Sequence, residues 1–417
     1  MQTAQPDNPS NLARPAIRAL SESRIRRVAN AAMGRADVLA FWFGEPDGVT
    51  PVAVREAAKA SLDAGDTFYG PTLGLPQLRE SLAHYLSALH RPVGIERIAI
   101  TNSGVNGLML ACQAILSPGD RVVAVVPLWP NLVEIPAILG AEVNRVSLEL
   151  DPHSQRWRLD LDALLERLTP GTRAVMINSP NNPTGWVMTA QDQAALLAHC
   201  RRHGIWILSD EAYDRLVFGP SDGSHALSDS PPAEPVGAPS MLDLADPDDA
   251  LIVANTFSKT WQMTGWRLGW LVLPVSLVAD LGKLIEFNTS CAPAFIQKAG
   301  VVAVETGEAD LAAFRRRLTL GRETLLTELC TIPGITAGIP DGAMYAFFRV
   351  DGTRDSVALA QHLVQTSGLG LAPGAAFGPE GEGWLRWCFA RPPAMLLEGV
   401  QRLRHGLGLL QGTDPYR

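Results

Sequence analysis

The chain has 417 residues, 47% of them hydrophobic, which is enough to fill the cores of two or three domains. Its formal net charge of −8 and its isoelectric point near 5.5 argue against a nucleic-acid-binding protein, which needs a basic surface. No apolar run approaches the roughly 18 residues of a membrane helix, and the polar first residues do not resemble a secretory signal.

Most of the chain is predicted to alternate between helices and short apolar strands. After a partly helical N-terminal arm, helices are expected at 51–64, 74–90, 104–116, 131–139, 161–168 and 190–202. Strands are expected at 98–101, 122–126, 142–148, 174–178, 205–209, 251–254 and 268–273. This alternation predicts an α/β fold with a mostly parallel sheet covered by helices on both faces. Ligands of such sheets bind at the carboxyl ends of the strands, so functional residues should directly follow strands.

The pattern changes after about residue 290, where a smaller α+β domain is predicted. Its helices are expected at 308–330, 355–365 and 393–409. Its strands are expected near 345–350, 370–372 and 384–388. We therefore divide the chain into an N-terminal arm that joins the small domain (1–50), a large domain (51–290) and a small C-terminal domain (291–417). Within the large domain, residues 219–250 are rich in Pro, Ser, Asp and Gly and are expected to form a loop or partly disordered insertion.

The five cysteines are scattered and lack CxxC spacing, as expected of reduced thiols in a cytoplasmic protein. No metal site is expected. His199 and His203 flank Cys200 on a predicted helix, a spacing that can hold a metal. Without a carboxylate or second cysteine nearby, a solvated helix end is the favoured interpretation.

Lys259 follows the strand predicted at 251–254, close to the hydroxyl groups of Thr256 and Ser258. In apolar surroundings a lysine shifts toward its neutral, nucleophilic form. Arg267 adds a cation eight residues further on, and the hydroxyl groups complete a cradle for an anion. A lysine that forms an imine with a phosphorylated aldehyde needs this set of groups, although a surface lysine after a strand is the commoner occurrence.

Two further strands are followed by groups that suit a phosphorylated ring. Ser103, Gly104 and Val105 open a helix, whose free N–H groups and positive dipole end can bind phosphate; an ordinary N-cap is the alternative. Trp129 follows the next strand, where an indole can either stack on a flat ring or fill the core.

Polar residues follow the strands at 174–178 and 205–209 as well. Asn182 lies in a stiff loop rich in proline and asparagine, from which a side-chain amide can donate to a phenolate oxygen. Asp210 ends an apolar run, where a carboxylate is costly without a cation such as a protonated pyridine nitrogen. Tyr213 can donate to the ring oxygen. A helix-capping role is the alternative for Asp210.

With these motifs the chain resembles the class I/II aminotransferases, pyridoxal 5'-phosphate enzymes of the aspartate aminotransferase fold, from about residue 35 to 410. The best matches are the stretches 182–185, 210–213, 256–259 and 265–267. The resemblance implies that Lys259 forms the Schiff base with the cofactor and shuttles protons, with Asp210 and Tyr213 as further catalytic residues. It implies that the phosphate is held by Ser103, Gly104, Val105, Thr256 and Arg267, with Ser258 as a possible helper. It further implies that Trp129 stacks on the ring, that Asn182 and Tyr213 contact its 3-oxygen, and that Asp210 pairs with its nitrogen.

The resemblance also implies a substrate site and a dimer. Arg386 matches the arginine that binds the α-carboxylate of the substrate, for which a bidentate guanidinium is suited. Gly44 and Asn182 match residues that line the substrate site. Tyr69 matches a tyrosine that reaches the phosphate of the neighbouring subunit, which implies a homodimer with shared active sites. Three features depart from the usual pattern: Thr256 in place of serine, Trp129 in place of tyrosine or phenylalanine, and the long insertion.

The implied reaction moves the amino group of an L-amino acid to a 2-oxo acid in a ping-pong cycle. A β-lyase or decarboxylase on the same fold is an alternative, because the same cofactor linkage permits either outcome. A non-enzymatic, ligand-sensing regulator is less expected, since only about 35 residues precede the motifs and the chain is acidic. No second arginine for an acidic side chain is evident. Aromatic residues near the motifs suggest an apolar pocket or simply core: Trp42, Phe43, Trp129, Trp186 and Phe377.

Overall fold

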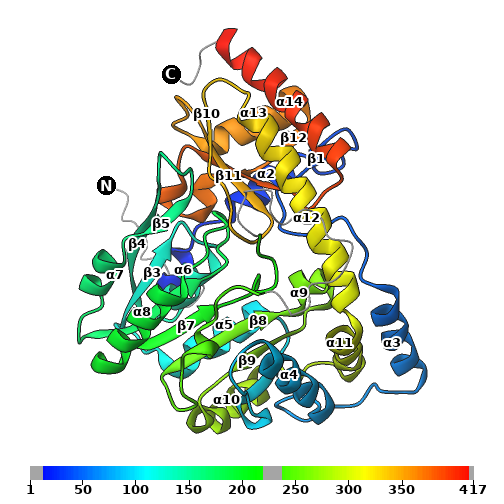
Figure 1. Cartoon of the computed structure of the whole chain (residues 1–417), viewed down its shortest axis with the longest axis vertical. Helices are drawn as coiled ribbons and strands as arrows, with labels where there is room; N and C mark the ends of the chain where they lie inside the picture. Colours follow the sequence, from blue (N-terminus) through cyan, green and yellow to red (C-terminus); the bar gives the residue numbers. More distant parts are fainter. Residues whose placement is uncertain (1–12, 219–236, 413–417) are drawn as a thin grey trace, which may run out of the picture.

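A computed structural model describes residues 13–218 and 237–412 and shows one large sheet flanked by helices, with a smaller sheet beside it (Figure 1). The large sheet has eight strands in the order β2-β9-β8-β7-β6-β3-β4-β5. In chain order they are β2 (Ile98–Thr101), β3 (Arg121–Val126), β4 (Glu142–Leu150), β5 (Trp157–Leu159), β6 (Thr172–Asn178), β7 (Trp206–Asp210), β8 (Leu251–Thr256) and β9 (Gly269–Val272).

The prediction of a mostly parallel sheet is confirmed. Strands β4, β3, β6, β7 and β8 run parallel to one another. The strand expected at 268–273 is β9, which runs antiparallel between β8 and β2, and β5 pairs antiparallel with β4. Every residue of β2 and β8 is buried, as expected of strands covered on both faces.

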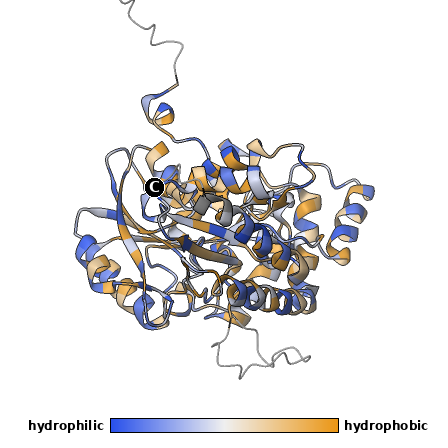
Figure 2. Ribbon diagram, turned by 90° about the horizontal axis from the view of Figure 1, so that it is seen from above, coloured by the Kyte–Doolittle hydropathy of each residue, from blue (hydrophilic) through white to orange (hydrophobic). Residues whose placement is uncertain are grey.

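Helices cover both faces of this sheet. They are α4 (Pro76–Leu89), α5 (Gly104–Ile115), α6 (Asn131–Ile138), α7 (Leu161–Arg167), α8 (Ala190–His203), α10 (Val275–Asn288) and α11 (Ala294–Thr306). A further helix, α3 (Val52–Asp63), packs on the outside of α11. Hydrophobic residues are concentrated along the central strands, whereas the outer helices carry both hydrophobic and hydrophilic residues (Figure 2). The helix α8 illustrates how local sequence sets the ends: Thr189 caps its first turn and Gly204, at φ 65°, ends it.

Two helices of the large unit, α10 and α11, were not expected from the sequence. Each is preceded by a proline at the N-cap position, Pro274 and Pro293. Inside a helix, proline lacks the N–H group for a backbone hydrogen bond and clashes with the preceding turn. Where a helix begins, proline is well tolerated, because no such hydrogen bond is needed there. Pro274 and Pro293 therefore mark the starts of helices and do not break them.

The smaller unit contains an antiparallel sheet in the order β10-β11-β14-β13. Its strands are β10 (Ile335–Ala337), β11 (Tyr345–Val350), β13 (Ala372–Pro373) and β14 (Trp384–Cys388), and its helices are α12 (Glu308–Leu329), α13 (Ser356–Ser367) and α14 (Pro393–Gly412). The long helix α12, yellow in Figure 1, runs from beside α11 toward α14 and connects the two units.

The N-terminal arm contains α1 (Pro15–Arg18), α2 (Arg24–Ala31) and β1 (Leu39–Ala40). Helix α1 contacts α6 of the large unit, whereas the rest of the arm packs against the smaller unit, where β1 pairs in parallel with β12 (Leu369–Gly370). Helix α2 packs on α13, whereas α11, which follows residue 290, packs on α3 and α4. The division into domains at residues 50 and 290 remains a prediction.

The predicted insertion at 219–250 lies partly outside the described residues, which resume at 237. Its described end is not disordered: η3 (Met241–Asp243) is held by a capping box from Ser240, and Met241 and Leu242 are buried. Among the helices of the described chain, none is long and apolar enough to span a bilayer.

Candidate active site

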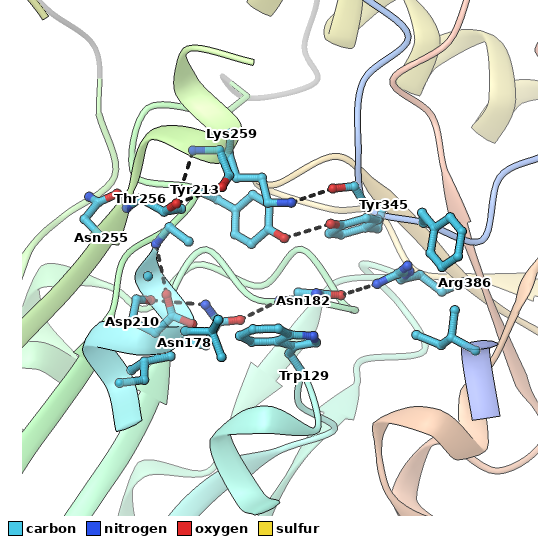
Figure 3. Close-up of a pocket in the computed structure, with 18 of the residues that line it drawn as sticks. Trp129, Asn178, Asn182, Asp210, Tyr213, Asn255, Thr256, Lys259, Tyr345 and Arg386 are labelled. Atoms are coloured by element: carbon cyan, nitrogen blue, oxygen red, sulfur yellow. Dashed lines mark hydrogen bonds between the residues drawn. The ribbon is translucent and has the colours of Figure 1, made fainter. Parts of the chain in front are cut away.

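A cavity of about 270 Å³ lies at the carboxyl ends of the parallel strands, where the large sheet meets the smaller unit. Figure 3 shows Asp210 toward one end of the cavity and Arg386 toward the other, with Lys259, Tyr213 and Trp129 between them. Most of the residues singled out in the sequence line this cavity: Gly44, Gly104, Val105, Trp129, Asn182, Asp210, Tyr213, Thr256, Ser258, Lys259, Arg267 and Arg386. The cavity therefore lies where functional residues were expected, directly after the parallel strands.

Lys259 follows β8, as predicted, and lies on α9 (Phe257–Thr260), a single helical turn. The Thr256 hydroxyl caps this turn by accepting from the backbone N–H of Ser258 at 3.1 Å. Lys259 Nζ donates to the carbonyl oxygen of Gly44 at 2.5 Å and lies 5.7 Å from the centre of the Tyr213 ring. Burial lowers the pKa of Lys259 to about 8. Its amine can therefore lose its proton near neutral pH.

This lowered pKa predicts a pH-dependent gain in stability for Lys259→Met. Between about pH 8 and 10.5 the unfolded chain binds more protons than the folded chain, so the free energy of unfolding of the ligand-free protein rises across that window. Below pH 8 the buried charge costs about 3 kcal/mol, which methionine avoids. Urea unfolding should show the variant to be more stable at pH 7 and the difference to shrink by pH 10. Lys283→Met, at an exposed site, should show no such trend; a constant difference for Lys259→Met would contradict the expectation.

Asp210 is the last residue of β7 and is 6% exposed. The backbone N–H of Ala212 donates to one of its carboxylate oxygens at 3.1 Å. Burial raises the pKa of Asp210 to about 7, and no lysine or arginine of the described residues forms an ion pair with it. A buried acid that borders a cavity without a cationic partner fits a ligand that brings a positive charge.

An anion cradle forms where α5 begins. Ser103 is buried behind the cavity wall and does not line it; its hydroxyl accepts from the N–H of Asn106 at 3.1 Å. The backbone of Ser103 has a φ of 139°, a strained value for a residue with a side chain. Gly269 lets β9 approach this turn, since a Cβ there would lie 2.6 Å from the nitrogen of Gly104. The N–H groups at this helix end are thereby presented to the cavity.

Hydroxyl and guanidinium groups surround the same helix end. Thr256 Oγ1 lies 2.9 Å from Ser258 Oγ, and Arg267 Nη1 lies 3.5 Å from that same oxygen. Burial lowers the pKa of Arg267, whose guanidinium also donates to the carbonyl of Thr264 at 2.6 Å. The donors present at this end of the cavity are those that phosphate requires.

Arg386 extends from β14 and is 2% exposed. It donates through Nη1 to Asn182 Oδ1 at 2.8 Å and through Nη2 to the carbonyl of Trp42 at 2.5 Å. Its Nε is buried without a hydrogen-bond partner in the described chain. A buried donor in that state is rare, and it fits a guanidinium prepared for an incoming carboxylate.

Three polar residues that line the cavity were not expected from the sequence. Asn178 accepts from the N–H of Asn182 at 2.7 Å and donates to the carbonyl of Asp210 at 3.1 Å, so it joins two of the loops. Asn255 and Tyr345 also line the cavity. The position of Asn178 at the end of a predicted strand could have indicated its role. Tyr345 lies on a strand of the smaller sheet, and no local pattern indicates it.

Several predicted residues lie elsewhere. Tyr69 is outside the cavity and 90% exposed. Trp186 and Phe377 are buried and do not line the cavity, although Phe377 packs against the guanidinium of Arg386 at 4.8 Å. Trp42 and Phe43 do line it, as the aromatic-pocket interpretation expected. His199 Nε2 donates to the carbonyl oxygen of Leu168 at 2.8 Å, which uses one of its ring nitrogens in the fold.

The family model for aminotransferases of class I and II matches residues 36–403. The chain belongs to this family. It is 31% identical to an aspartate aminotransferase of Pyrococcus horikoshii, over 93% of this chain and 95% of that protein. It is 30% identical to an arginine–pyruvate transaminase of Pseudomonas aeruginosa, over 94% and 90% of the two chains. These matches confirm the predicted family and activity class, and the protein is an aminotransferase.

Solved structures confirm the fold of the aminotransferase. An aspartate aminotransferase from Thermus thermophilus, solved with maleate, superimposes with a TM-score of 0.83 at 28% identity, covering 95% of this chain and 99% of that one. An aromatic aminotransferase from Pyrococcus horikoshii superimposes with a TM-score of 0.81 at 27% identity, covering 93% and 99%. The relatives act on side chains as different as those of aspartate and aromatic amino acids, so the family does not fix the substrate side chain.

Proposed function

We propose that this aminotransferase holds pyridoxal 5'-phosphate in the cavity and uses Lys259 to bond covalently with it. The proposal rests on the convergence of three residues on one cavity: Asp210 from the end of β7, Lys259 from the turn after β8, and Arg386 from within β14. When bound, the cofactor supplies an electron sink for the negative charge that develops at the α-carbon of the substrate.

The residues of the cavity fit the parts of this cofactor. The helix end at Gly104 and Val105, with the hydroxyl groups of Thr256 and Ser258 and the guanidinium of Arg267, would hold the phosphate. The carboxylate of Asp210 would pair with a protonated ring nitrogen, and Trp129 would stack on the ring. Asn182 and Tyr213 would donate to the ring oxygen.

The remaining groups serve the substrates, an amino acid and a 2-oxo acid. Arg386 would bind the α-carboxylate through its fork of N–H groups, and the carbonyl of Gly44 would restrict the position of the Lys259 amine. Because the pKa of Lys259 is lowered to about 8, its neutral amine can accept the proton from the α-carbon of the amino acid at neutral pH.

Borohydride reduction of the native enzyme tests the covalent proposal. Peptide mass spectrometry should then find a phosphopyridoxyl group on Lys259, and Lys283, which is exposed, should carry none. Adding an amino acid to the unreduced enzyme should convert the cofactor to its amine form and release one equivalent of 2-oxo acid. Release of pyruvate and ammonia from a β-substituted amino acid, without any acceptor, would instead support a β-lyase.

We further propose that the aminotransferase is a cytoplasmic homodimer. Three aromatic side chains of the described residues are strongly exposed: Phe68 (84%), Tyr69 (90%) and Phe287 (90%). A hydrogen bond of 3.1 Å between Thr72 and Glu286 keeps the two segments that carry them together. An exposed aromatic cluster of this kind favours a protein–protein interface, and Tyr69 would reach the neighbouring site from there.

Hybrid dimers test this proposal. Lys259→Ala and Tyr69→Ala chains, each weakly active alone, should recover activity when mixed under conditions that exchange subunits, because one site of the hybrid then has both residues. A monomeric mass by light scattering, or no recovery on mixing, would contradict it.

The wall of the cavity near α2 favours an amino donor with an apolar or aromatic side chain. Ile25, Trp42 and Phe43 line that part. The charged side chains among the described lining residues are Asp210, Lys259, Arg267 and Arg386, all of which have other proposed partners. A carboxylate placed against the apolar wall would lose its hydration without compensation.

Phenylalanine and leucine should therefore exceed aspartate in kcat/KM by at least about 10-fold. Phe43→Ala should lower kcat/KM for phenylalanine by about 10-fold and leave that for alanine nearly unchanged, because alanine does not reach the ring. The measurement is a donor panel with one fixed oxo-acid acceptor. Arg26, whose guanidinium lies 5.9 Å from the centre of the Phe43 ring, provides the opposing test. A preference for aspartate that Arg26→Gln abolishes would overturn the expectation.

A further inference from the structure

We propose that Tyr345 is a positioning residue that fixes the hydroxyl group of Tyr213 and the guanidinium group of Arg386 at the same time. Tyr345 belongs to the smaller sheet, and its side chain meets groups from both sheets in the cavity (Figure 3). The inference rests on the proposed function, in which Tyr213 contacts the cofactor and Arg386 binds the substrate carboxylate.

The first contact is between two phenol groups. Tyr345 is completely buried, and its hydroxyl oxygen lies 2.7 Å from that of Tyr213. Their rings meet edge to face, with centres 5.7 Å apart and planes at 78°. Burial raises the pKa of both phenols, so both remain protonated at neutral pH. Each hydroxyl group thus has one proton to donate.

The direction of this hydrogen bond decides what Tyr213 can do. If Tyr213 donates to Tyr345, it has no proton left for an anionic oxygen in the cavity. If Tyr345 donates, Tyr213 keeps its proton for that oxygen and is held in place by the bond it accepts. Once an anionic ring oxygen is bound, the second arrangement is the one in which all three oxygens are satisfied. Tyr345 thereby supports the donor role of Tyr213.

The second contact is between the ring of Tyr345 and the guanidinium of Arg386. Arg386 pairs with Phe347 in the β11–β14 ladder, which places Tyr345 two residues along on the same face of the sheet. Arg386 Cζ lies 4.3 Å from the centre of the Tyr345 ring. This contact, with the hydrogen bonds to Asn182 and Trp42, restricts the plane of the guanidinium. The guanidinium, which borders the cavity, is thereby held in one orientation.

The backbone of Gly44 leaves room for the Tyr345 hydroxyl. A Cβ added at Gly44 would lie 2.0 Å from that oxygen, so any side chain there would displace Tyr345. The carbonyl of the same glycine accepts from Lys259 Nζ. The backbone of Gly44 therefore contacts both the Tyr345 hydroxyl group and the amine of Lys259.

Two variants separate the two contacts. Tyr345→Phe removes the hydroxyl and keeps the ring, whereas Tyr345→Leu removes both. In the holoenzyme, the pH midpoint of the cofactor absorbance should rise by about 0.5–1 unit in both variants, because Tyr213 then donates less effectively to the ring oxygen. The dissociation constant of 3-phenylpropionate should rise about 10-fold in Tyr345→Leu and less than about 2-fold in Tyr345→Phe.

Binding of 3-phenylpropionate is measured by the fluorescence of Trp42 and Trp129, which line the cavity. This binding measurement can also be made with the cofactor-free protein. A protein that does not bind the cofactor would contradict the proposed function, and the role of the Tyr345 ring would still be tested by 3-phenylpropionate binding. Phe348→Leu is the matched control, because Phe348 is equally buried on the same strand and packs toward Trp387. It should lower thermal stability without moving either readout.

Two outcomes would overturn the inference. An absorbance midpoint in Tyr345→Phe equal to that of the wild type would show that the hydroxyl does not support Tyr213. An equal loss of 3-phenylpropionate binding in Tyr345→Leu and Phe348→Leu would show that the ring only fills space.

Discussion

Replacing Lys259 by alanine is expected to lower kcat by about 10⁴-fold, the largest effect of any single change in this chain. The substitution removes both the nucleophile that bonds to the cofactor and the amine that accepts the α-proton. No other lysine lines the cavity among the described residues, so no neighbouring amine is placed to replace it. Single-turnover measurements with an amino donor, followed by cofactor absorbance, give the rate of the affected half-reaction directly.

Cofactor binding is the control for this variant. The phosphate cradle and Asp210 do not depend on the lysine, so Lys259→Ala should still retain the cofactor through dialysis, although more weakly. Lys283→Ala, on the exposed face of α10, should keep the wild-type rate. A Lys259→Ala enzyme that turned over within about 10-fold of the wild type would rule out the assigned role.

Asp210→Asn is expected to lower kcat/KM by about 10³-fold. Asparagine keeps the size of the side chain and the acceptor for the Ala212 N–H, but it removes the negative charge. Breaking one partner of a buried charge pair costs about 3–5 kcal/mol, and each 1.4 kcal/mol is a factor of ten in rate. Asp210→Glu keeps the charge and should retain more activity. Steady-state kinetics with one donor and one acceptor measure both.

The same substitution should act in the opposite direction on the cofactor-free protein. Burial raises the pKa of Asp210 to about 7, so the ionised carboxylate disfavours the folded state as the pH rises from about 4 to 7. Asn cannot ionise, and the Asp210→Asn protein should be the more stable one at pH 8. Higher stability with lower activity would show that the acid is retained for its ligand. A loss of both would indicate that Asp210 only supports the fold.

Much of the site was predictable because its signals are local. Asp210, Asn182 and Lys259 each follow an apolar run within a few residues, and parallel strands bring such positions to one edge. The direction of β9 was not predictable, because its apolar pattern is the same whether a buried strand runs parallel or antiparallel to its neighbours.

The contacts that sequence analysis missed are long-range. Tyr345 and Tyr213 are separated by 132 residues, and their hydroxyl groups meet only because the smaller sheet packs over the end of the large one. The 3.6-residue and 2-residue periodicities describe which face of an element is buried, but not which other element covers it. The unpartnered Nε of Arg386 is also a property of packing alone.

The groups that grip the substrate and the groups that react with it are attached to different sheets. Arg386 belongs to the smaller sheet, whereas Lys259 follows a strand of the larger one. The accuracy with which an α-carbon faces the amine is therefore set by how rigidly the two sheets are held together. Substitutions along α12, far from any reacting atom, would loosen that alignment and slow turnover without altering a single catalytic side chain.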